Sequence, residues 1–168
     1  MNLAGNEATV TFDQSGTGLL KLTSAILISG YGHSKTIALR GDTAGTGELA
    51  GDLTDPHDRT GKATTTLTKS GTGKWTLSGS NSCRGPTKIA GGVLVCMKAD
   101  SLSSGPLAIS GGARLHLSFN GTRKVAALTL NGDSPATPGT FGSTASTAEH
   151  KDDSCFSGSG TITVTPRD

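Results

Sequence analysis

One pattern recurs along this chain: a glycine-rich corner followed by a short strand in which apolar and polar residues alternate. The clearest copies are Ile89-Ala-Gly-Gly-Val-Leu-Val-Cys and Ile109-Ser-Gly-Gly-Ala-Arg-Leu-His, which align without a gap. They are separated by about 20 residues, a period typical of solenoid proteins, in which each repeat forms one coil. The repeat therefore predicts a stack of coils.

A second recurring motif supports the same architecture. Ser-Gly-Thr-Gly or Ser-Gly-Ser-Gly precedes an alternating strand at Ser15, Ser70 and Ser157. The 168 residues include 25 glycines, and aromatic residues make up 4% of the chain, which suits tight corners around a narrow aliphatic interior. No segment shows a sustained 3.6-residue period, so little helix is expected. We predict a single all-β domain over residues 1–168.

One segment near the end of the chain lacks the repeat. Pro135 to Asp153 is rich in Pro, Gly, Ser, Thr and Asp. We expect an irregular loop or cap over about residues 133–156. Such a segment can cover an end coil, whose unpaired strand edges would otherwise invite aggregation.

Three segments carry a family resemblance. They are Leu67-Thr-Lys-Ser-Gly-Thr-Gly-Lys-Trp-Thr-Leu-Ser-Gly-Ser-Asn-Ser, Gly85-Pro-Thr-Lys-Ile-Ala-Gly-Gly-Val-Leu and Leu102-Ser-Ser-Gly-Pro-Leu-Ala-Ile-Ser-Gly-Gly-Ala. These segments resemble the passenger-associated β-strand repeat of bacterial autotransporter-type surface proteins. The resemblance implies a right-handed parallel β-helix that is secreted or displayed on the cell surface, as a stalk or adhesive passenger. Cys83-Arg84-Gly85 departs from the pattern expected there.

The ungapped alignment makes a specific prediction about two reactive side chains. It places Cys96 on His116 and Val95 on Leu115. With coils stacked at about 4.8 Å and Leu115 facing inward, Cys96 and His116 face outward on adjacent coils. A thiol beside an imidazole can act as nucleophile and base, or supply half of a metal site. The alternative is an accidental pair, because the outer face of a solenoid tolerates any residue.

A polar cluster in the first half is a second candidate. Asp55, His57 and Asp58 offer two carboxylates and an imidazole within four positions, which would suit acid-base chemistry or an oxygen-liganded cation. The alternative is a solvated turn, in which Asp55 before Pro56 starts the turn.

Several function classes receive little support. The net charge of +2 gives no strong field for nucleic acid, and no apolar run is long enough to insert into a membrane. Neither a Gly-x-Ser-x-Gly elbow nor a phosphate-binding loop occurs, so no cofactor is expected. Cys83, Cys96 and Cys155 allow at most one internal disulfide, and their spacing matches no zinc finger. Any signal peptide would lie outside this chain.

We therefore expect a structural or adhesive segment of a secreted or surface-exposed bacterial passenger protein, without catalysis. Its expected partners are cell-surface glycans or other surface proteins. The alternative is a hydrolase or lyase directed at polysaccharides or esters, with a site on the outer face of the β-helix, since parallel β-helices often carry such sites. In that case the candidate catalytic residues are Asp55, His57, Asp58, Cys96 and His116.

Overall fold

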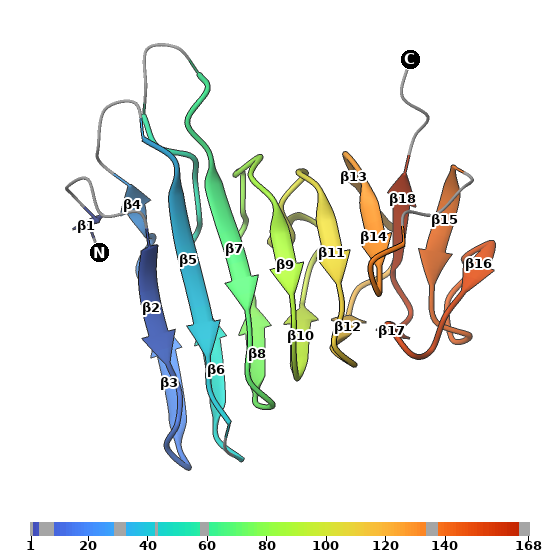
Figure 1. The fold of residues 1–168 in the computed structure, drawn as a ribbon, viewed down its shortest axis with the longest axis horizontal. Coiled ribbons are helices and arrows are strands. Elements are labelled where there is room, and N and C mark those ends of the chain that lie inside the picture. The colour runs from blue at the N-terminus through green and yellow to red at the C-terminus, as the bar shows by residue number, and fades with distance from the viewer. Residues whose placement is uncertain are drawn as a thin grey trace.

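The computed structural model describes residues 2–3, 9–28, 33–42, 44–57, 61–133 and 138–164. Two six-stranded parallel sheets make up most of the molecule, and their strands lie side by side along its long axis (Figure 1). Sheet I has the strand order β14-β11-β9-β7-β5-β2, and sheet II has the order β17-β12-β10-β8-β6-β3. The expected all-β parallel solenoid is confirmed.

The chain alternates between the two sheets, so each coil adds one strand to each. Sheet I contains β2 (Thr9–Asp13), β5 (Lys35–Arg40), β7 (Thr65–Lys69), β9 (Thr87–Ile89), β11 (Leu107–Ile109) and β14 (Leu128–Leu130). Sheet II contains β3 (Leu19–Leu22), β6 (Thr46–Leu49), β8 (Lys74–Leu77), β10 (Val93–Cys96), β12 (Arg114–Leu117) and β17 (Phe156–Gly158). Both faces of a coil therefore pair in parallel with the coils before and after it.

Shorter contacts close the third side of the stack. β1 (Asn2–Leu3) pairs with β4 (Leu27–Ile28), and a single parallel bridge joins Ile26 to Leu53. The side-chain oxygen of buried Asn81 accepts a hydrogen bond from the Leu53 amide at 2.9 Å. The backbone N–H of Asn81 donates to the carbonyl of Asp100, at 2.7 Å, in the short helix η1 (Ala99–Ser101). Asn81 thus links three successive coils.

The interior is built from rows of side chains, one from each coil. In sheet II, Trp75, Leu94 and Leu115 form one buried row, and Leu77, Cys96 and Leu117 form the next. Because successive side chains in a strand point to opposite faces, every second residue of these strands lies in the core. In β8, for example, Trp75 and Leu77 share the buried side of the strand, opposite Lys74 and Thr76.

The register of β10 and β12 differs from the ungapped alignment. Val93 lies opposite Arg114, and Cys96 lies opposite Leu117 rather than His116. The corner before β12 is one residue longer: Gly111 and Gly112 both adopt positive φ, at 63° and 71°, and the turn closes through a 3.0 Å bond from the Ala113 amide to the Ser110 carbonyl.

In the preceding corner only the second of the two glycines, Gly92, has a positive φ, of 61°. The same Gly-Gly dipeptide thus forms two different turns. A shift of one residue moves every side chain of a strand to the opposite face, so the predicted orientations of Val95, Cys96 and Leu115 could not all hold.

The C-terminal end of the stack carries a small mixed sheet with the order β13-β18-β15-β16. Its strands are β13 (Thr122–Val125), β15 (Gly139–Gly142), β16 (His150–Lys151) and β18 (Thr161–Val164). β15 runs antiparallel to β18 and parallel to β16. The described part of the segment 133–156, which was expected to be irregular, therefore contains β15 and β16. The Ser143 hydroxyl beyond β15 donates to the Gly158 carbonyl at 2.7 Å, which links this sheet to β17.

Candidate binding surface

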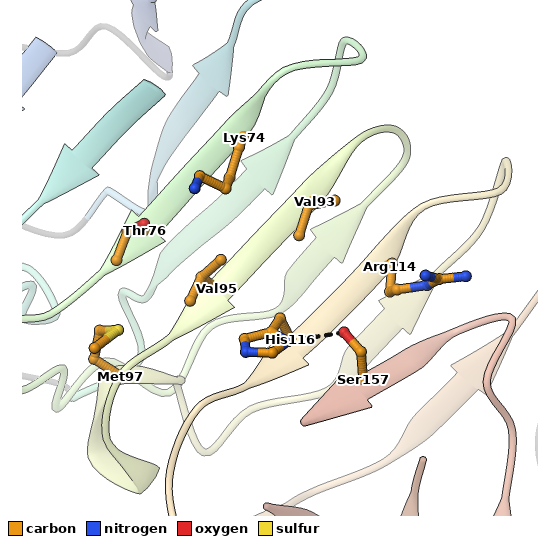
Figure 2. A pocket seen from close by; sticks show the side chains of 8 residues that line it. All are labelled: Lys74, Thr76, Val93, Val95, Met97, Arg114, His116 and Ser157. Atoms are coloured by element: carbon orange, nitrogen blue, oxygen red, sulfur yellow. Dashed lines mark hydrogen bonds between the residues drawn. The ribbon is translucent and has the colours of Figure 1, made fainter. Parts of the chain in front are cut away.

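The outer face of sheet II is hollowed into a shallow trough of about 440 Å³. Figure 2 shows the side chains around it, which come from β8, β10, β12 and β17 and from the turn after β10. The trough is lined by Lys74, Thr76, Val93, Val95, Met97, Arg114, His116 and Ser157.

Strand register explains why these residues meet. Lys74, Val93 and Arg114 lie opposite one another on β8, β10 and β12 and form one outward row. Thr76, Val95, His116 and Ser157 form the next row, two residues further along each strand. The inward residues between them are buried, so the trough rests on a packed core.

The trough is positively charged. Lys74 and Arg114 both line it, whereas no carboxylate does, and neither cation has an ion-pair partner within the described parts of the chain. The nearest acid toward the N-terminal end of sheet II is Glu48, on the strand beside β8. Its carboxylate accepts a 2.6 Å bond from Ser78 and pairs with Lys21 at 3.0 Å; these contacts, led by that of Ser78, lower its pKa.

On the other side of Arg114 lies Asp153. Its two carboxylate oxygens accept hydrogen bonds from the amide and hydroxyl of Thr144, both at 2.8 Å. These two bonds lower the pKa of Asp153, and the charge of Arg114 makes a smaller contribution. Both oxygens of the Asp153 carboxylate are therefore already hydrogen-bonded within its own loop, to Thr144.

His116 contacts a hydroxyl across the last step of the sheet. Its Nδ1 lies 2.9 Å from the Ser157 Oγ, as the dashed line in Figure 2 marks. A serine beside an imidazole is the first half of a nucleophilic constellation, which also needs a group that orients the imidazole. Among the hydrogen bonds of the described residues, none joins His116 to a carboxylate.

The predicted pair of Cys96 and His116 is wrong. Cys96 is fully buried in the row of Leu77 and Leu117, while His116 is half-buried on the outer face beside Val95. Burial raises the pKa of the Cys96 thiol to about 12, so the thiolate that nucleophilic chemistry needs is absent near neutral pH.

The polar cluster of the first half is divided by the fold. Asp55 is half-buried, and its carboxylate accepts bonds from the Thr65 amide (2.8 Å) and from Arg84 Nε (2.9 Å), so it ties three coil segments together. His57 is exposed, and Asp58 lies outside the described residues. Over the part of the chain that the structure describes, no three His, Cys, Asp or Glu side chains gather as a metal site.

The trough contains two cationic residues that the sequence did not single out. Lys74 and Arg114 come from two separate strands, and each looks like an ordinary surface residue in the chain. The strand register would have revealed them. When the repeats are aligned with a one-residue gap before Arg114, Lys74 and Arg114 fall in one row.

Comparison with known proteins identifies the repeat. Residues 67–95, which span β7 to most of β10, match the passenger-associated-transport-repeat. These residues therefore carry a passenger-associated repeat of the autotransporter type. Over 84 residues, or 49% of its length, the chain is 38% identical to the adhesin BmaC autotransporter of Brucella suis biovar 1 (strain 1330).

The chain matches only a small part of that relative. The alignment spans 2% of the adhesin's length. No solved structure gave a significant match to the chain. No helix among its described residues is long and apolar enough to cross a membrane.

Proposed function

We propose that this passenger region is an adhesive segment of a protein displayed on the bacterial surface. The observation that carries the proposal is the passenger repeat at residues 67–95 together with 38% identity to an adhesin. The architecture supports it: a stack of coils holds a regular outer face to solvent, and side chains there are free to vary without disturbing the core.

The experiment is an adhesion assay with the folded chain. Beads coated with the purified chain are applied to epithelial cell layers, and the adhering beads are counted. Beads coated with a Leu94→Glu variant serve as the control, because a charge at this fully buried position should unfold the coil. We expect adhesion by the native chain alone. If native, variant and albumin-coated beads bind equally, the adhesive function is wrong, and the chain would act as a spacer instead.

The contact between His116 and Ser157 favours a second candidate, a hydrolase acting on esters or polysaccharides at the outer face. The constellation is incomplete, because no carboxylate orients the imidazole among the described contacts. Release of nitrophenol from nitrophenyl esters and of reducing ends from polysaccharides would test it. Turnover that is lost in both His116→Ala and Ser157→Ala would favour the enzyme over the adhesive segment.

A further inference from the structure

The trough on sheet II has the composition of a binding site for a charged carbohydrate. We infer that it binds a carboxylated polysaccharide, a chain of sugars that carries uronic acids. This inference rests on the proposed adhesive function and names the ligand of its outer face.

The positions of Lys74 and Arg114 favour an anion whose charges are widely spaced. Lys74 and Arg114 stand in the same outward row but on strands two steps apart, so their Cα atoms are separated by roughly 9.5 Å. Val93 lies between them. In Figure 2 the Lys74 and Arg114 side chains extend away from one another, so their charges are spread along the trough rather than gathered at one point. They suit a ligand whose carboxylates recur at intervals along a chain, and the guanidinium fork of Arg114 matches a carboxylate in two parallel hydrogen bonds.

The remaining lining fits a sugar backbone. Val93, Val95 and Met97 form an apolar strip, and Met97 is 44% exposed. Such a strip suits the C–H faces of sugar rings. Thr76 and Ser157 present hydroxyls at its margin, where ring hydroxyls can exchange hydrogen bonds with them. A densely sulfated chain would instead favour clustered cations, whereas Lys74 and Arg114 are separated by the strand that carries Val93.

The backbone excludes one competing occupant. β10 is hydrogen-bonded to β8 on one side and to β12 on the other, so a peptide cannot add to it as a further strand. A ligand in the trough lies across the strands and is held by side chains only. This favours a hydroxylated, charged chain over an extended peptide that needs main-chain partners.

The test measures binding of three oligosaccharides of equal length to the purified chain by calorimetry: oligogalacturonate, a heparin fragment and neutral dextran. We expect oligogalacturonate to bind, dextran not to bind and heparin to bind more weakly. The double variant Lys74→Gln/Arg114→Gln should weaken oligogalacturonate binding at least about tenfold.

The matched control is Lys88→Gln/Lys124→Gln, which removes the same charge from exposed positions on β9 and β13, outside the trough. It should change the Kd less than about twofold. An equal loss in both double variants would overturn the site, as would tighter binding of heparin or no binding of oligogalacturonate. Surface substitutions at all four positions should leave the melting temperature within about 2 °C, so a binding loss is not unfolding.

The adhesion assay separates this inference from the proposed function. If beads carrying Lys74→Gln/Arg114→Gln adhere as well as the native chain, the adhesive function stands and the trough is not its site. If the native chain binds oligogalacturonate in the calorimeter but its beads do not adhere, the ligand assignment stands and the adhesive function fails. Loss of both properties in the trough variant alone supports both.

Discussion

The indole ring of Trp75 occupies the space in which a side chain at Gly47 would lie. The two residues are opposite one another on β8 and β6, and a Cβ placed on Gly47 would come within 2.3 Å of the ring. The indole nitrogen donates to the Arg40 carbonyl at 2.7 Å, which fixes the ring over the glycine. One coil therefore lacks a side chain so that the next can bury the single tryptophan of the protein.

Gly47→Ala should destabilise the fold by about 1–3 kcal/mol, because the added methyl overlaps a buried ring in a close-packed core. Unfolding in urea, followed by the fluorescence of Trp75, measures the loss. Gly18→Ala is the control, since a Cβ at Gly18 meets no atom within 4 Å. Equal stability of both variants would contradict the packing described for Trp75.

The register of β10 is tested by charges at adjacent positions. Leu94→Glu should destabilise the fold by about 3 kcal/mol or more, because it buries an unpaired carboxylate at a fully inaccessible position. Val95→Glu faces outward and should cost less than about 1 kcal/mol. Thermal unfolding by circular dichroism separates the two. If Val95→Glu lowered the stability more than Leu94→Glu, Val95 would face the core, as the ungapped alignment predicts.

Asp55 is predicted to act as a structural clamp. Asp55→Ala leaves the Thr65 amide and Arg84 Nε without their acceptor and should lower the stability by about 1–3 kcal/mol. His57→Ala removes an exposed side chain and should change the stability by less than about 0.5 kcal/mol. Chemical denaturation of both variants checks the difference. A stable Asp55→Ala variant would revive a role for this carboxylate in a site.

Lys69 gives the stability a dependence on alkaline pH. Its side chain is buried, and Nζ donates to the carbonyls of Ser70 at 2.8 Å, and of Gly71 and Gly91, both at 3.0 Å. Burial lowers the pKa of Lys69 to about 8, and the charge of Asp42 partly opposes this effect.

Below pH 8, Lys69 is protonated in both the folded and the unfolded chain. Between about pH 8 and 10.5 the folded chain loses this proton first, so the unfolded chain binds more protons and the free energy of unfolding rises with pH. Measured against Lys69→Met, the native chain should gain on the order of 1–3 kcal/mol over this interval. A constant or falling difference would contradict the lowered pKa.

The cysteines should resist modification in the folded protein. Burial raises the pKa values of Cys83 and Cys96 to about 12, and both thiols lie in the core. In a Cys155→Ser variant, the two thiols should react with a disulfide reagent at pH 8 only after denaturant is added. Rapid modification of the folded variant would show that a thiol is accessible after all.

Repetition made the general architecture predictable from the sequence. Glycine corners and strands with a two-residue period favour one structure at every coil, and alternate residues such as Trp75 and Leu77 are buried. The candidate site was not predictable to the same degree. Cys96 was predicted to face outward and the shared row of Lys74 and Arg114 was overlooked, because both errors follow from aligning β10 with β12 without the extra residue in the corner before β12.

The sequence by itself determined that this chain forms a stack of parallel coils, since local strand and turn preferences are repeated in every copy. Only the tertiary structure decided which residues share a row. Identical Gly-Gly dipeptides form turns of different length, because Gly111 and Gly112 both adopt positive φ whereas Gly91 does not. Each strand has a two-residue period, so this single conformational choice brings Arg114 into the row of Val93 and Lys74 and sets Leu117, not His116, opposite the buried Cys96.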